Sequence, residues 1–160
     1  MGDIENVERF LREHSFFKNM DPAACKTVAE CAANEAFNAG DYLIREGDLA
    51  DKFYLLRHGN VALEVPVRGS ESMIVETLQE GDVLGWPWLV SPYRWRVDAR
   101  ALHLVRAISL DASCLRDQCE RDHTLGFELF KRFIPVIASR LEAGRFQLID
   151  MYSKYYDRSK

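Results

Sequence analysis

Residues 40–61, GDYLIREGDLADKFYLLRHGNV, decide the fold class of this chain. Two short runs rich in Leu, Ile, Tyr and Phe lie between turns that contain Gly40, Gly47 and Gly59. Apolar runs of this length, bounded by Gly and Asp, are typical of β-strands. Glycine suits the turns because it adopts positive φ at little cost. The segment therefore predicts strands joined by tight turns.

The same pattern continues to about residue 110. Four more apolar runs follow at roughly even intervals: VALEVPVRGS, SMIVETLQEGD, VDARALHL and RAISLD. Several short strands at this spacing favour a sandwich or a barrel. We therefore expect an α+β fold with an antiparallel β jelly-roll or double-stranded β-helix barrel at residues 41–111, with N-terminal helices and a long C-terminal helix around it.

Residues 1–40 are predicted to form the N-terminal helices of this single domain. Apolar positions 4, 7, 10 and 11 have helical spacing. Asp21 followed by Pro22 is typical of a helix start, with an N-cap and then a first-turn proline. We expect the run AACKTVAECAANEAF after it to be helical, so that the helices end near Gly40.

Residues 112–160 are predicted to be C-terminal helices. Asp111 or Ser113 can cap a short helix through about Glu120, and Asp122 can cap a longer one to about Tyr156. Pro135 is expected to kink or split the longer helix. Apolar residues in it follow a 3,4 spacing that predicts a parallel homodimer seam, with packing on its own domain as the alternative. The proposed seam residues are Ile137, Leu141, Gly144, Leu148, Met151 and Tyr155, preceded in the same spacing by Phe127, Phe130 and Ile134.

Composition and charge exclude several classes of protein. The formal net charge is -4, whereas a general nucleic-acid binder normally shows a basic surplus. The N-terminus lacks the basic and apolar regions of a signal peptide, and no apolar run is long enough to span a membrane. These features predict a cytoplasmic protein without a membrane partner.

No motif in the chain points to catalysis or to a metal site. The four cysteines form no CxxC pair and the four histidines are scattered, so we expect free thiols and no metal. Nucleophile and phosphate-loop motifs are missing. The sequence therefore predicts a non-enzymatic protein without a cofactor.

From about Phe16 to Leu148 the chain resembles the cyclic nucleotide-binding domain superfamily. The resemblance is carried by a series of turns and strand positions: Gly40-Asp41, Glu46-Gly47-Asp48, Phe53-Tyr54, Leu56, Gly59, Val61, Gly81-Asp82, Leu84-Gly85, Ala101 and Leu110-Asp111. It implies that ligand bound to a cassette between two strands repositions the C-terminal helices.

The resemblance places the phosphate-binding cassette at residues 83–100, VLGWPWLVSPYRWRVDAR. The family pattern there is Phe-Gly-Glu-x-Ala-Leu, followed later by an Arg that pairs with the phosphate. In this chain Trp86 takes the Glu position. Counting back from Ala101 without a gap places Trp95 at the Arg position, and a one-residue shift in the loop would instead place Arg94 or Arg96 there. The candidate ligand-binding residues are Leu84, Gly85, Trp86, Trp88, Leu89, Arg94, Trp95 and Arg96.

Three interpretations of this cassette remain open. The tryptophans can fill the pocket as structural residues. The pocket can instead take a different small anion or planar ligand, with Arg94 or Arg96 holding its charge and a Trp face stacking on its ring. In the third, an exposed aromatic-arginine cluster docks a protein partner. Asp98 and Arg100 are expected to point outward on the next strand without a special role.

The sequence therefore predicts a regulatory or sensor module with weakened or altered cyclic-nucleotide binding. Because no helix-turn-helix follows the long helix in this sequence, we expect a stand-alone module without direct DNA binding. One alternative is a ligand-free protein-interaction scaffold. Another is a true cyclic AMP-binding signalling protein, if Arg94 or Arg96 replaces the family arginine.

Overall fold

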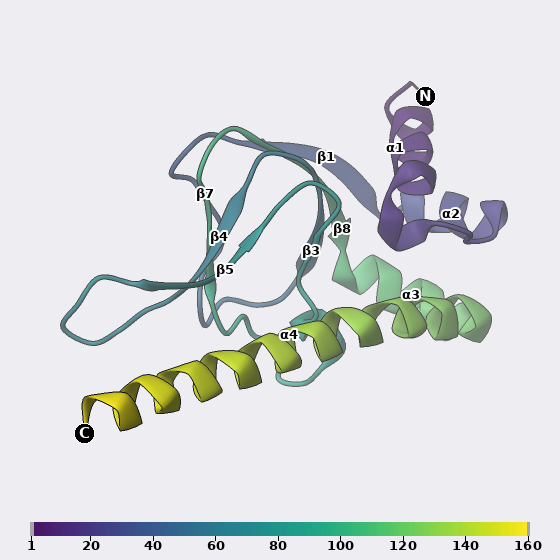
Figure 1. Cartoon of the computed structure of the whole chain (residues 1–160). Helices are drawn as coiled ribbons and strands as arrows, with labels where there is room; N and C mark the ends of the chain where they lie inside the picture. The colour runs from purple at the N-terminus through teal and green to yellow at the C-terminus, as the bar shows by residue number, and fades with distance from the viewer. Residues whose placement is uncertain (1, 160) are drawn as a thin grey trace.

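The computed structural model describes residues 2–159 and begins with three short helices. They are α1 (Gly2–Glu13), the 3-10 helix η1 (Ser15–Phe17) and α2 (Pro22–Ala29). The Asp21 carboxylate accepts hydrogen bonds from the first-turn amides of α2, so the predicted N-cap is confirmed. In Figure 1 these helices lie at one end of the barrel, away from the C-terminus.

The centre of the molecule is a pair of antiparallel four-stranded sheets, as the strand pattern predicted. One sheet has the order β1-β8-β3-β6 and the other β2-β7-β4-β5. The strands are β1 (Ala32–Phe37), β2 (Tyr42–Ile44), β3 (Lys52–His58), β4 (Val61–Val65), β5 (Met73–Leu78), β6 (Val83–Leu84), β7 (Asp98–Ala101) and β8 (Val105–Asp111). Their inward side chains form one continuous core with residues from the helices.

The prediction that the N-terminal helices continue to about Gly40 was wrong. Helix α2 ends at Ala29, and Ala32–Phe37 form the edge strand β1, which pairs with β8 from Ala32 opposite Leu110 to Phe37 opposite Val105. The run AANEAF contains good helix formers. The hydrogen bonds and packing that it gains by pairing with β8 contribute more free energy than its helix propensity, so it forms a strand.

Two further helices complete the fold. Asp111 caps α3 (Ala112–Arg121) through the amide of Cys114, and Asp122 caps α4 (His123–Arg158) through the amides of Thr124 and Leu125. Pro135 does not split α4, which is one helix of 36 residues. Figure 1 shows α4 running along one side of the barrel, with its C-terminal turns extending beyond it.

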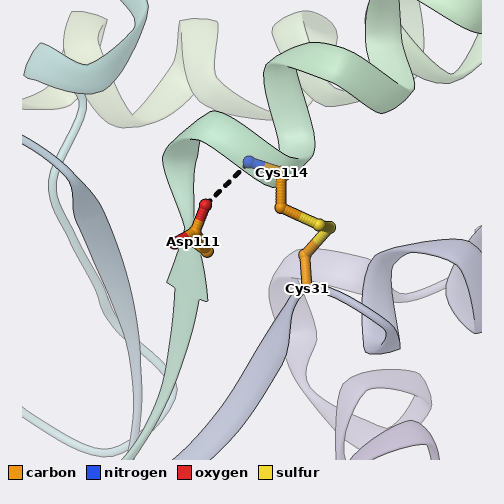
Figure 2. The surroundings of a disulfide bond; sticks show 3 residues. All are labelled: Cys31, Asp111 and Cys114. Carbon is orange, nitrogen blue, oxygen red and sulfur yellow. Dashed lines mark hydrogen bonds between the residues drawn. A yellow bond between two sulfur atoms is a disulfide. The ribbon is translucent and has the colours of Figure 1, made fainter.

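The expectation that all four cysteines are free thiols was also wrong. Cys31, just before β1, forms a disulfide with Cys114 on α3, across 83 positions of sequence (Figure 2). Cys25 is a buried free thiol and Cys119 a partly buried one. The backbone amide of Asp111 also donates to the carbonyl of Cys31, so a backbone bond and the disulfide join the same two segments.

No helix within residues 2–159 combines the length and the apolar character that a membrane crossing requires.

Candidate functional site

The cassette predicted at residues 83–100 begins with a sharp change of direction after β6. Gly85 has φ +114°, and a Cβ atom there would lie 2.4 Å from a ring carbon of Trp95, so only glycine fits. The 3-10 helix η2 (Pro87–Leu89) follows, with Trp86 as its N-cap residue but no side-chain capping bond. Pro87 has no N–H, so this helix start offers one amide fewer to an anion.

Trp88 is part of the core. Its side chain is 1% exposed and stacks on Phe53, with ring centroids 5.1 Å apart and an interplanar angle of 13°. It also meets the edge of Phe133 on α4 at 5.5 Å, and its carbonyl accepts a hydrogen bond from Arg116 on α3. Trp88 therefore connects the cassette to both C-terminal helices.

Trp95 points inward and lies against Gly85. Its backbone amide donates to the carbonyl of Asp48, and its own carbonyl accepts from the amide of Gly47. The turn after β2 therefore fixes the direction of the segment. Arg94 consequently points outward, is exposed and donates to the carbonyl of Gly47. Because Trp88 and Trp95 are both buried, the interpretation of the tryptophans as an exposed docking cluster was wrong for these two.

A cavity of about 250 Å³ lies between the cassette and α4. On the barrel and cassette side it is lined by Leu63, Val75, Glu76, Leu84, Gly85, Trp86, Pro87, Trp95, Arg96 and Val97, and on the helix side by Arg140, Ala143, Gly144 and Gln147. Of the two candidate arginines, only Arg96 lines it. Within residues 2–159 its lining contains no Ser, Cys or His side chain.

Two side chains hold α4 against the barrel at the edge of this cavity. Arg140 donates to the carbonyl of Val83 at 2.5 Å and lies 3.5 Å from the carboxylate of Glu76. Gln147 donates to the carbonyl of Val75 at 2.8 Å. Burial lowers the pKa of Arg140, although it remains charged at any ordinary pH.

Sequence reasoning missed the helix side of the cavity. Arg140, Ala143 and Gln147 repeat at a spacing of three and four, directly beside the proposed seam. In this second stripe the small residue Ala143 lies between two side chains that can form hydrogen bonds. Such a pattern is consistent with a helix face that packs over a cavity.

The strand after the cassette also differs from expectation. Asp98 is 5% exposed and accepts a hydrogen bond from the amide of Glu46, with Arg45 at 3.6 Å. Arg100 forms an ion pair with the buried carboxylate of Glu64. Both residues therefore stabilise the barrel. Asp98 is buried under the turn that contains Glu46, so the expectation that it has no special role was wrong.

The residues of the proposed dimer seam lie along the free side of α4. Leu141, Leu148, Met151 and Tyr155 are 55–71% exposed, while Ile137 and Gly144 are partly buried. Every described residue from 145 onward is exposed, although Gln147 still donates to the carbonyl of Val75. Phe127, Phe130 and Ile134 continue the exposed stripe toward α3.

Comparison with known proteins identifies a family for this architecture. A model of the cyclic nucleotide-binding domain matches residues 34–122. The chain is 29% identical over 133 residues to human cGMP-dependent protein kinase 2; this covers 81% of the chain but only 17% of the kinase.

Solved structures show the same fold. A Geobacter metallireducens protein, described as a cyclic nucleotide-binding protein, is 26% identical with a TM-score of 0.74, covering 84% of this chain and 97% of that one. A cyclic nucleotide-binding domain from Methylobacillus flagellatus has a TM-score of 0.77 at 14% identity, covering 92% and 83%. The second likeness concerns the fold alone.

Proposed function

Because this chain belongs to the cyclic nucleotide-binding domain family, we propose that it is a non-enzymatic regulatory domain that senses a small molecule other than cyclic AMP or cyclic GMP. The ligand binds in the cavity between the cassette and α4. Helix α4 responds, since it supplies one wall of that cavity.

The position of Trp95 is the observation that carries this proposal. Its indole lies against Gly85, where the family pattern requires an arginine beside a phosphate. Trp86 replaces the family glutamate, and Pro87 removes a backbone donor from the helix start. The two family positions that pair with the cyclic phosphate and its ribose therefore hold Trp95 and Trp86 in this chain, while a cavity lined by one cassette arginine, Arg96, remains beside them.

The cavity is placed so that its occupancy affects α4. The bonds from Arg140 to Val83 and from Gln147 to Val75 lie on the wall that a ligand contacts. A ligand that adds contacts to both walls stabilises the docked helix, because it binds this arrangement better than any other. A ligand that separates the two walls has the opposite effect.

A fragment screen tests the proposal without assuming a ligand. A set of water-soluble fragments is screened by thermal shift, and each hit is followed by hydrogen exchange. We expect hits to change exchange both at residues 83–89 and at residues 140–147. Ala143→Phe fills the cavity from α4 and should abolish these effects, whereas Ala138→Phe, on an exposed position of the same helix, should not.

The alternative is a constitutive scaffold that has kept the fold and lost the ligand. The exposed apolar stripe on α4 favours it, since such a stripe is suited to a protein interface. A screen without any hit that Ala143→Phe abolishes would support the scaffold and contradict the sensor.

We also propose that α4 pairs with α4 of a second copy through the seam residues. Two parallel helices related by a two-fold axis would bury Leu141, Leu148 and Met151 against their counterparts. The cytoplasmic location stays a prediction, and a disulfide such as Cys31–Cys114 is more typical of oxidising compartments.

A further inference from the structure

We propose that the cavity selects a small, flat monoanion, such as an aromatic carboxylate, and that Arg96 is its charge partner. This inference rests on the proposed function, because it names the chemical class of ligand for the same cavity.

The charges around the cavity give the sign and the size of the ligand charge. Its lining contains three ionised side chains, namely Glu76, Arg96 and Arg140. Glu76 lies 3.5 Å from Arg140, and Asp82 also contributes an attractive charge to Arg140. Arg96 forms no salt bridge within the part of the chain that the structure describes. Arg96 is exposed, and it is therefore the ionised lining side chain that is available to pair with a ligand carrying a single negative charge.

The walls give the shape. Trp86 is partly exposed at the cavity, and Trp95, Leu63 and Val75 supply further apolar surface. An indole face prefers to pack on another flat ring. A volume of about 250 Å³ lies just below the usual range of small-molecule sites. A compact ring with one carboxylate fits these walls better than a nucleotide.

The helix side of the cavity completes the site. Gln147 uses its amide nitrogen on Val75, which leaves its carbonyl oxygen free as an acceptor. Arg140 donates to the carbonyl of Val83, and its charge is balanced by the carboxylate of Glu76, so it attracts an anion less strongly than Arg96 does. The anionic group is therefore expected near Arg96, with the ring directed toward α4.

The test compares acids with their uncharged amides. Benzoate with benzamide, and indole-3-acetate with indole-3-acetamide, are titrated into the full chain by calorimetry at low salt. We expect at least one acid to bind about tenfold to hundredfold more tightly than its amide, as a charge-assisted hydrogen bond implies. Equal affinity of acid and amide in both pairs, or no binding of either acid up to millimolar concentration, overturns the inference.

Matched variants assign the charge partner. Arg96→Gln should remove most of the preference for the acid and leave the affinity for the amide within about twofold of the unmodified chain. Arg94→Gln removes the neighbouring arginine, which points away from the cavity, and should change neither. A preference that survives Arg96→Gln contradicts the assignment.

These results separate the two proposals. If fragments that carry no charge protect residues 140–147 and Ala143→Phe abolishes their binding, the sensor function stands and the anion inference falls. If no fragment of any kind is affected by Ala143→Phe, the proposed function itself falls.

Discussion

Removing the Cys31–Cys114 disulfide should cost a large part of the stability of this domain. The bond closes a loop across 83 sequence positions, for which the chain-entropy model gives about 4.5 kcal/mol at 25 °C. The backbone hydrogen bond from the Asp111 amide to the Cys31 carbonyl remains, so we expect the native pairing of β1 with β8 to survive the change. Measured losses of native disulfides run at about 2–5 kcal/mol, which is the range that we expect.

The assay is urea unfolding of the Cys31→Ser, Cys114→Ser double variant at a fixed protein concentration, because dimerisation would make stability depend on concentration. With a slope of about 2 kcal/mol per molar urea, the midpoint should fall by about 1–2.5 M. Cys119→Ser, which removes a partly buried free thiol, is the control and should have a much smaller effect. A midpoint that is the same for the double variant and the unmodified chain would refute the reasoning, as would insensitivity of the unmodified chain to reductant.

Three further changes probe the core, the pH response and the helix. Trp88→Ala should destabilise the fold by about 3–5 kcal/mol. Trp88→Phe keeps the stacking on Phe53 and removes a buried N–H that has no partner among residues 2–159, so it should cost clearly less. Equal losses of stability for both variants in thermal melts would argue against the core role. Burial lowers the pKa of His14, so the unfolded chain binds the proton more readily and stability should decline as pH falls below about 6.5. His14→Gln should flatten that decline and His58→Gln, at an exposed site, should not; an unchanged pH profile for His14→Gln would be the contrary result. Sedimentation should show a dimer for the unmodified chain and a monomer for Leu148→Asp at tens of micromolar, since the charge would lie on the seam; a monomer for both would mean that α4 serves its own domain only.

Local side-chain chemistry made the helix starts predictable. Asp21, Asp111 and Asp122 each accept hydrogen bonds from amides within three positions, so a short stretch of sequence contains the whole interaction. The strands of the barrel were predictable for a similar reason, because their alternation with turn residues is local. The two turns at Gly47 and Gly59 have positive φ at these residues, as the glycines predicted.

Interactions between distant segments were not predictable in this way. Strand β1 is specified by its pairing with β8, some seventy positions away, and the disulfide by the approach of α3 to the same place. The inward direction of Trp95 depends on backbone hydrogen bonds to Gly47 and Asp48. The sequence alone does not distinguish this arrangement from a one-residue shift of the loop that would bring Arg94 or Arg96 to the same position. Arg140 and Gln147 reach the cavity only because α4 folds back along the barrel.

The central claim, that this cassette no longer holds a cyclic phosphate, is tested most directly by calorimetric titration of the unmodified chain with cyclic AMP and cyclic GMP. Loss of the ribose partner and of the phosphate's charged partner should together cost at least about 3 kcal/mol, more than a hundredfold in affinity. We therefore predict no saturable heat below about 100 μM of either nucleotide. Micromolar or tighter binding of either one would contradict the account, because it would require a phosphate seat where the structure places the indole of Trp95.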